Sequence, residues 1–438
     1  MRRKPAICIY KRRSTVFGAK MLNSGVLSVL KKLGLYARVI DHVFKPMRLG
    51  RLVINMPEGD TLVYGEGQGG ANAELTVRSM DFFKKCVLYG DVGFGESYVD
   101  GDWETNDIDK VIEWMLINVE NHPTLMSDKT KYKPVNFLKA LNVLSSLSRK
   151  NSRKGSRRNI HEHYDLGNEF YSLFLDRTMT YSSAYFGRGS GTLEEAQYQK
   201  YEQLCQKVRL KRTDHLLEIG SGWGGFAAHA VKNFGCHVTT VTVSKEQFDY
   251  VKERIRREGL ADKLTVELRD YRDLQGEYDK IVSIEMLEAV GHEFYETYFR
   301  QCHRLLKKNG LLALQVILSP DSRYASFRKN IDWIQKHIFP GSLLPSFEII
   351  QNSLRKTGTL GLFDYEDMTK HYVKTLEMWH ENFNLRSDDI LRLGFNPTFM
   401  RKWNYYWCYC IAAFRTRNIA VAQMVFSRPN NGFLTESL

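Results

Sequence analysis

The segment Leu-Glu-Ile-Gly-Ser-Gly-Trp-Gly-Gly at residues 217–225 joins an apolar run at 215–219 to a helical pattern at 226–234. Glycines in such a strand-to-helix turn let the backbone approach a ligand closely, and the helix N-terminus supplies N–H donors. The spacing of Gly220, Gly222 and Gly225 formally satisfies the G-x-G-x-x-G pattern. The segment therefore predicts a ligand site, and a dinucleotide is one alternative for the ligand.

Two neighbouring features favour S-adenosylmethionine (SAM) over a dinucleotide. A dinucleotide site needs an acidic residue about 20 residues further on to hold the ribose, but the next strand ends Val-Thr-Val-Ser at 241–244. Glu218 stands just before the first glycine, where a carboxylate would repel a pyrophosphate and attract the ammonium or sulfonium group of SAM. We therefore expect SAM to bind here, with Glu218 beside it.

Strands and helices alternate from residue 161 onward, which indicates a parallel α/β sheet with crossover helices. The fold class is thus expected to be α/β and Rossmann-like, with a mostly helical, aromatic-rich insertion at 320–417. Ser244 is expected to cap the second helix. The expected strands span 215–219, 236–243, 263–268, 279–287, 311–318 and 420–428, and the expected helices span 226–234, 245–258 and 292–309.

The first 160 residues are basic. The whole chain holds 63 Lys/Arg against 50 Asp/Glu, a net charge of +13, and residues 1–158 alone hold 27 against 16, a net charge of +11. Basic clusters attract polyanions, either nucleic acid or an anionic membrane surface. We expect a basic segment at 1–50, a smaller α+β domain at 51–147 that associates with lipid, a basic linker at 148–160, and a catalytic domain at 161–430.

Local patterns give this front part its expected elements. Strand-like runs at 51–67 and 73–83 contain a turn signal at 57–60. Helical patterns are expected at 25–36, 108–119 and 134–148.

Composition excludes several classes of protein. With 43% hydrophobic and 26% charged residues the chain is ordinary globular protein, and no apolar run reaches the roughly 18 residues of a spanning helix. The seven cysteines are scattered and form no C-x-x-C pair, which argues against a disulfide framework or a zinc module. His161, His163 and His303 lack metal-ligand spacing, so we expect no metal.

Six further segments occur in a fixed order along the chain, at 161–186, 216–230, 241–247 (VTVSKEQ), 286–291 (MLEAVG), 338–346 (IFPGSLLPS) and 405–428. Together they resemble the cyclopropane-fatty-acid-phospholipid synthase family, which is related to the mycolic acid cyclopropane synthases. The resemblance covers residues from about 80 to about 428. It implies a seven-stranded, mostly parallel sheet, a homodimer, and SAM-dependent transfer of a methyl carbon to the double bond of an unsaturated acyl chain in a membrane phospholipid.

The resemblance also implies site residues. The SAM contacts would be Tyr181, Ser182, Gly220, Ser221, Gly222, Gly224, Thr242, Ser244, Gln247, Tyr271 and Arg272. The family holds a bicarbonate ion thought to act as the base, and its ligands map to Ser183, Glu288, Gln315, Ile317 and Tyr372. A family cysteine maps to Cys410.

Three positions depart from the family pattern. Ser183 replaces a common cysteine, Ala289 replaces a common histidine, and Gln315 replaces the histidine among the bicarbonate ligands. A glutamine amide can hydrogen-bond an anion but carries neither a proton nor a charge. Ring closure needs loss of a proton from the new methyl group, so a methyl- or methylene-branched product stays open beside the cyclopropane.

The predicted chemistry passes through a carbocation on the acyl chain. Glu288 would stabilise that positive charge or orient a base. Aromatic residues of the C-terminal helices would form core or acyl-tunnel wall, and some would face the cation: Tyr372, Trp379, Phe383, Trp403, Tyr405, Tyr406 and Trp407.

Two other classes of function are compatible with parts of the sequence. A nucleic-acid methyltransferase would fit the charge, but no D/N-P-P-Y tetrapeptide is present, and a non-catalytic lipid-binding protein is a further alternative. We expect no nucleic-acid partner and a cytoplasmic enzyme held peripherally on the inner face of the membrane.

Overall fold

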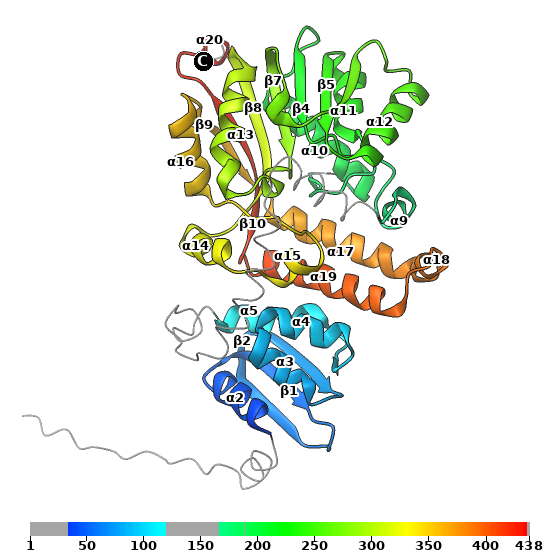
Figure 1. The fold of residues 1–438 in the computed structure, drawn as a ribbon, viewed down its shortest axis with the longest axis vertical. Coiled ribbons are helices and arrows are strands. Elements are labelled where there is room, and N and C mark those ends of the chain that lie inside the picture. Colours follow the sequence, from blue (N-terminus) through cyan, green and yellow to red (C-terminus); the bar gives the residue numbers. More distant parts are fainter. Residues whose placement is uncertain (1–33, 120–165, 188, 436–438) are drawn as a thin grey trace, which may run out of the picture.

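The computed structural model describes residues 34–119, 166–187 and 189–435. A large α/β unit and a small N-terminal unit lie on opposite sides of a layer of long helices (Figure 1). The predicted helix at 134–148, the linker at 148–160 and most of the helix predicted at 25–36 lie outside the described residues.

The large unit is built on a seven-stranded sheet in the order β6-β5-β4-β7-β8-β10-β9. Only β10 runs against its neighbours within the described sheet, so the predicted α/β fold with a mostly parallel sheet is confirmed. The central strands are largely buried because helices cover both faces. The strands are β4 His215–Ile219, β5 His237–Thr242, β6 Leu264–Leu268, β7 Tyr278–Ile284, β8 Leu306–Leu318, β9 Gly361–Asp367 and β10 Ala420–Ser427.

Helices flank the sheet largely where the sequence places them. Ser244 caps α12 by accepting a hydrogen bond from the Gln247 backbone N–H, as predicted. The sheet is accompanied by α9 Asn168–Ser172, α10 Leu193–Lys207, α11 Gly225–His229, which continues as a π turn over Ala230–Phe234, α12 Lys245–Arg257, α13 Tyr295–Leu305, α16 Phe347–Thr357 and α20 Gly432–Thr435.

Two elements differ from the sequence-based expectation. The helix predicted to reach residue 309 ends at Leu305, because Leu306 is buried and already pairs with Tyr278 as the first residue of β8. Residues 361–367 form strand β9 inside the insertion that was expected to be mostly helical. This short strand lies at the edge of the sheet. Its own sequence did not predict a strand, and pairing with β10 stabilises it there.

The helical layer comes from the insertion between β8 and β10. Its longest members, α17 and α19, pack on one another between the sheet and the N-terminal unit (Figure 1). The helices are α14 Asp321–Lys329, α15 Trp333–His337, α17 Thr369–Leu385, α18 Ser387–Arg392 and α19 Pro397–Arg415. In the described ranges, none of the helices combines the length and the apolar character needed to cross a bilayer.

The N-terminal unit is a small α+β body. Its strand β1 (Leu49–Asn55) lies between the two halves of the long β2 (Thr61–Val77), which also pairs with β3 (Trp103–Glu104). Helix α2 (Leu35–Phe44) buries Ala37, Ile40 and Phe44 in the same core, so the folded unit begins before residue 51. The remaining helices are α3 Asp81–Tyr89, α4 Asp91–Val99 and α5 Ile108–Val119, the last as predicted.

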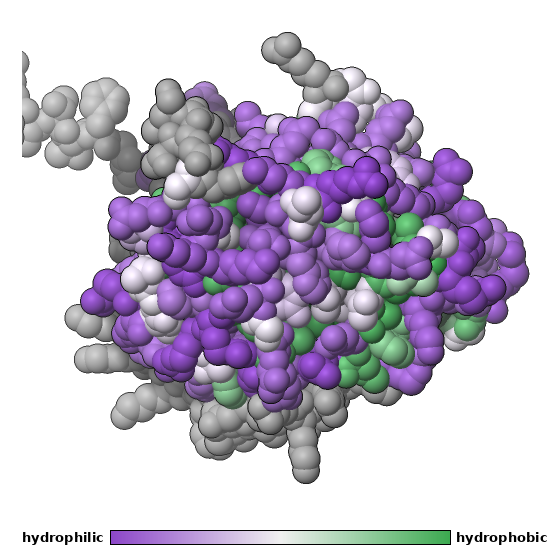
Figure 2. All heavy atoms as spheres, turned by 90° about the horizontal axis from the view of Figure 1, so that it is seen from above, coloured by the Kyte–Doolittle hydropathy of each residue, from purple (hydrophilic) through white to green (hydrophobic). Residues whose placement is uncertain are grey.

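The two units share one hydrophobic core and do not meet at a solvated polar interface. A Cβ on Gly95 of α4 would come within 2.4 Å of the Trp333 ring and 2.7 Å of the Tyr405 ring, so glycine allows close approach there. Arg401 of α19 donates to the Tyr98 carbonyl at 2.6 Å and stacks over the Tyr98 ring. Seen from the sheet end (Figure 2), the surface is mainly hydrophilic, with hydrophobic side chains in smaller patches.

Candidate active site

The glycine loop lies between β4 and α11, as predicted. Gly220, Gly222 and Gly224 have φ angles of 97°, 49° and 79°, a region that glycine enters without a steric penalty. A Cβ on Gly222 would meet nothing within 4 Å, so the loop is open to a ligand there. Gly220, Ser221 and Gly222 line a cavity, whereas Gly224 is the N-cap of α11 and faces Val251.

Glu218 lies at the end of β4 and lines the same cavity. Its carboxylate accepts a hydrogen bond of 2.5 Å from the Thr240 hydroxyl. Burial raises the pKa of Glu218 to about 8, against the opposing effects of Thr240, Lys200 and Arg254. A cationic ligand would offset the cost of ionising this buried acid. The ammonium or sulfonium group of SAM meets that requirement.

Three predicted residues after β5 are brought together. The Thr242 hydroxyl donates to the Gln247 side-chain oxygen at 2.8 Å, and both residues line the cavity. The Ser244 hydroxyl is instead the cap of α12 and bonds to Glu246. Ser244 thus holds the shape of this wall rather than facing the cavity.

Tyr271 and Arg272 follow β6 and also line the cavity. Arg272 is held by a bidentate ion pair with Asp270, with a shortest N···O distance of 2.6 Å. The buried Tyr271 hydroxyl has no hydrogen-bond partner among the described residues. It is therefore a polar group that a ligand can satisfy.

Tyr181 and Ser182 form the opposite wall. The Tyr181 hydroxyl shares a hydrogen bond of 2.9 Å with the Tyr406 hydroxyl of α19. The Ser182 hydroxyl accepts a hydrogen bond of 2.7 Å from the ammonium group of Lys200, which is a fully buried residue of α10. Burial lowers the pKa of Lys200, and the nearby carboxylates of Glu285 and Glu218 oppose that shift.

A carboxylate that the sequence analysis did not single out lies at the centre of the site. Glu285 directly follows β7 and has a φ of 48°, an uncommon value for a residue with a side chain. Its carboxylate accepts hydrogen bonds of 2.8 Å each from the Ser183 backbone N–H and the Gln315 amide. Tyr372 faces it as well. Burial raises the pKa of Glu285, and Gln315, Lys200 and Ser183 oppose the shift.

Glu288 lies one turn beyond Glu285. One of its carboxylate oxygens accepts a hydrogen bond of 2.5 Å from the Ile317 backbone N–H. The other oxygen is buried without a hydrogen-bond partner among the described residues. Burial, together with the charge of Glu285, raises the pKa of Glu288 to about 8. Glu288 therefore carries an unsatisfied oxygen at the cavity wall.

Gln315 is fully engaged by protein groups. Its amide nitrogen donates hydrogen bonds to the Glu285 carboxylate and, at 3.1 Å, to the Ser183 carbonyl. Its amide oxygen accepts a hydrogen bond of 3.0 Å from the Gln423 amide. An amide nitrogen has two hydrogens, and both are used here. The side chain predicted to hold an anion has no hydrogen left for one.

Tyr372 and Cys410 come from the helical layer and line the cavity. Burial raises the pKa of the Cys410 thiol, which favours the neutral thiol over the nucleophilic thiolate. Among the predicted aromatic residues, Tyr372 and Tyr406 line the cavity. The others are buried in the core beside it: Trp379, Phe383, Trp403, Tyr405 and Trp407.

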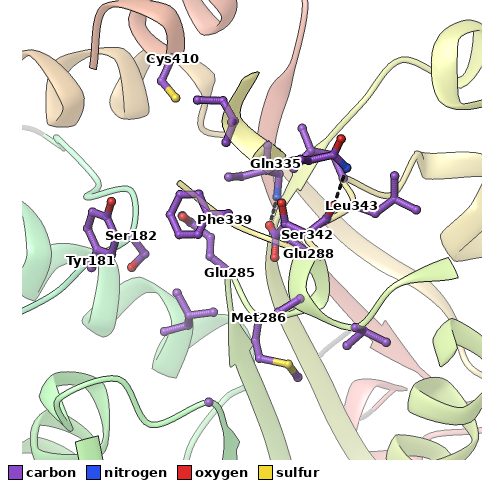
Figure 3. A pocket seen from close by; sticks show the side chains of 18 of the residues that line it. Tyr181, Ser182, Glu285, Met286, Glu288, Gln335, Phe339, Ser342, Leu343 and Cys410 are labelled. Carbon is purple, nitrogen blue, oxygen red and sulfur yellow. Dashed lines mark hydrogen bonds between the residues drawn. The ribbon is translucent and has the colours of Figure 1, made fainter. Parts of the chain in front are cut away.

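One continuous cavity of about 650 Å³ connects these groups. It runs from the glycine loop past the carboxylates to α14, α15 and α19, and reaches Tyr89, Val92 and Leu116 of the N-terminal unit. In Figure 3, Glu285 points into the space between Tyr181 and Glu288, and Cys410 lies across it on α19. Most of the exposed wall is apolar, as an acyl chain requires.

Comparison with known proteins adds the family. Residues 151–424 match the family model described as mycolic acid cyclopropane synthetase, which is more than half of the chain. The chain belongs to this family.

Individual proteins similar to this chain support the same family. It is 37% identical over 363 residues to the cyclopropane-fatty-acyl-phospholipid synthase of Escherichia coli K12, covering 82% of this chain and 89% of that protein. It is 34% identical over 381 residues to the tuberculostearic acid methyltransferase UfaA1 of Mycobacterium tuberculosis, covering 84% and 87%. The crystal structure of mycolic acid cyclopropane synthase CmaA1 with SAH and CTAB matches with a TM-score of 0.57 at 30% identity, covering 62% and 98%.

This member of the mycolic acid cyclopropane synthetase family is thus a methyltransferase of the cyclopropane synthase type that uses SAM. The structure brings the predicted SAM contacts around one end of the cavity, apart from Gly224 and Ser244. Of the predicted anion ligands, Ser183, Gln315 and Tyr372 meet at the carboxylate of Glu285, whereas the Ile317 N–H bonds to Glu288. An acidic residue directly after a strand, three positions before Glu288, is the sequence signal that would have pointed to Glu285.

Proposed function

We propose that the enzyme transfers a methyl carbon from SAM to the double bond of an unsaturated acyl chain of a membrane phospholipid and closes it to a cyclopropane. The observation that carries the proposal is the single apolar cavity that joins the glycine loop, the carboxylates and the N-terminal unit. The E. coli relative is named for a fatty-acyl-phospholipid substrate, which supports the same substrate class here.

The residues around the loop suit the methyl donor. SAM supplies an electrophilic methyl group, which a weakly nucleophilic alkene can attack. Glu218 would face the cationic part of SAM, Gly222 leaves room for it, and Tyr271 offers an unpartnered hydroxyl. We propose the same role for the other lining residues predicted from the resemblance: Tyr181, Ser182, Gly220, Ser221, Thr242, Gln247 and Arg272.

The aromatic wall beside the SAM contacts suits the cation that forms on the chain. The rings of Tyr181 and Phe339 are stacked, with centroids 6.2 Å apart, and Tyr406 lies beside them. Aromatic faces stabilise a cation by about 0.5–2 kcal/mol each without supplying a nucleophile. The Glu288 oxygen that has no hydrogen-bond partner among the described residues lies on the sheet side of the cavity, where a cation on the chain would favour the ionised form of this carboxyl. The site therefore stabilises positive charge while offering few groups that could trap it.

A second product is favoured by one comparison. The M. tuberculosis relative is named a tuberculostearic acid methyltransferase, so this chain's alternative product is a methyl- or methylene-branched acyl chain made by the same SAM chemistry. Which proton leaves the cation decides between ring and branch. An external reductant is needed for the saturated methyl branch.

Lipid analysis of a host that expresses the full chain and is fed methionine with a deuterated methyl group tests the proposal. Two deuterium atoms in a cyclopropane ring support it. Label in a methyl or methylene branch, separated by retention time and by hydrogenation, assigns the alternative. Absence of label from lipid, with SAM still bound by the purified protein, would exclude both lipid products. A host without the gene is the control.

We further propose that the basic front part holds the enzyme on anionic membranes. Residues 1–158 carry a net charge of +11, and each basic residue near such a surface contributes ~1 kcal/mol, which salt screens. Binding to anionic vesicles should fall by at least about tenfold between about 50 and about 500 mM salt. Binding that does not change with salt would contradict this role. Replacing the six basic residues between Arg149 and Arg158 by glutamine should weaken binding to anionic vesicles while leaving neutral vesicles unaffected.

A further inference from the structure

The groups that the family resemblance assigns to bicarbonate are already occupied by a side chain. The Ser183 backbone N–H and the Gln315 amide both donate to the carboxylate of Glu285, at 2.8 Å each. Tyr372, another predicted ligand of the ion, faces the same carboxylate. The Glu285 carboxylate thus occupies the hydrogen-bond donors that a bicarbonate ion would need.

A bicarbonate ion does not fit beside these residues. Gln315 has spent both amide hydrogens, and the Ile317 backbone N–H is taken by Glu288. A further anion would also lie between two buried carboxylates, Glu285 and Glu288, which already interact unfavourably. Like charges in a buried site repel strongly, and the ion would bring no donor that the carboxylates lack.

We infer that the carboxylate of Glu285 takes the place of bicarbonate and accepts the proton that leaves the alkylated acyl chain. This inference rests on the proposed function, since it assigns the base of that reaction. A carboxylate presents the same planar pair of oxygens as bicarbonate. A side chain on the sheet end is also fixed in place, so no second ligand has to bind before the proton is taken.

The proton transfer balances without a further reactant. After the methyl carbon has joined the chain, one C–H bond of that carbon breaks and its proton moves to a Glu285 oxygen. The electron pair of the broken bond forms the third carbon–carbon bond of the ring and cancels the positive charge on the chain. Glu285 becomes a neutral carboxylic acid, which returns its proton to solvent when the products leave.

Lys200 supplies a positive charge near this base. It is fully buried, donates to the Ser182 hydroxyl at 2.7 Å, and its charge favours the ionised form of Glu285. Burial raises the pKa of Glu285 and so favours the protonated carboxyl, which cannot accept the proton, whereas the charge of Lys200 opposes this shift. The burial that raises the pKa of Glu285 also makes the ionised form a stronger base, as the step requires.

The test uses the purified full chain with SAM and unsaturated phospholipid vesicles in buffer freed of carbon dioxide. We expect the wild type to form product at a rate that changes less than about twofold when bicarbonate is restored. Glu285→Gln should stay folded and bind SAM but form product roughly 100-fold more slowly, the typical contribution of a positioned base. Glu293→Gln, an exposed change on the same connection, should retain the wild-type rate.

A paired variant separates occupancy of the site from turnover. Gln315→His combined with Glu285→Gly frees the donors, so this protein should bind ¹³C-bicarbonate, seen by NMR line broadening, whereas the wild type should not. Bicarbonate binding by the wild type, strong stimulation of its rate by bicarbonate, or full activity of Glu285→Gln would each overturn the inference. Failure of the proposed function looks different: the wild type would then yield no modified lipid with or without bicarbonate.

Discussion

Replacing Glu218 by glutamine should stabilise the ligand-free enzyme while weakening its affinity for SAM. Burial raises the pKa of this carboxyl from an ordinary 4.5 to about 8. At pH 7 the unfolded chain is ionised at this position, whereas the folded protein must hold the carboxyl protonated. That difference costs about 3 kcal/mol at ~1.4 kcal/mol per pH unit. Glutamine keeps the size of the side chain and can still accept the Thr240 hydrogen bond, so it avoids the cost.

The pH dependence of this gain has a definite sign. Because the folded-state pKa is raised, the wild type loses no stability from Glu218 below pH 4.5, where the carboxyl is protonated in both states. Its stability falls as the pH rises from there to about 8. The advantage of Glu218→Gln should therefore be near zero at the acidic end of this window, grow through pH 7, and level off above pH 8.

Urea unfolding across this pH window measures the difference in the free energy of unfolding. The exposed Glu293→Gln is the matched control and should track the wild type. Calorimetric titration with SAM should show at least a tenfold loss of affinity, the effect of removing one buried charge partner, roughly 1.4 kcal/mol or more. A variant less stable than the wild type at pH 7, or a stability difference that does not change with pH, would refute the reasoning.

Two further predictions concern the helical layer. Arg401→Ala removes the guanidinium that bonds to the Tyr98 and Trp103 carbonyls, and should lower the free energy of unfolding by about 2 kcal/mol in urea; the exposed Arg386→Ala should cost much less, and equal effects would contradict the docking role. Cys410→Ala should keep product formation within about threefold of wild type and the native thiol should react slowly with iodoacetamide at pH 8, because burial keeps that thiol neutral. A loss of activity as large as that expected for a base would assign Cys410 a chemical role.

Local signals in the chain account for much of the site. The glycine loop after β4 predicted its own backbone geometry, since only glycine enters those φ values freely at three nearby positions. The absence of an acid after β5 and the presence of Glu218 pointed to SAM by charge alone. Ser244 was correctly predicted as a helix cap, which shows that a side chain can match the motif of a ligand site while its hydroxyl is spent on the backbone.

Tertiary contacts decided the features that the sequence did not predict. Strand β9 exists because β10 offers it an edge, and α13 stops early because Leu306 pairs with β7. The predicted break between a front segment and a domain at residue 51 falls within β1, and α2 packs on the same core.

The chain alone therefore determined the α/β fold, the SAM loop and the family, because strand and helix periodicity and glycine conformational freedom are local properties. What the sequence could not show is which groups meet. Gln315 looks like an anion ligand in the sequence, but in the fold its hydrogens are taken by Glu285 and Ser183. Hydrogen-bond saturation and burial depend on residues more than 100 positions apart, so only the tertiary structure could decide whether the site has room for a second anion.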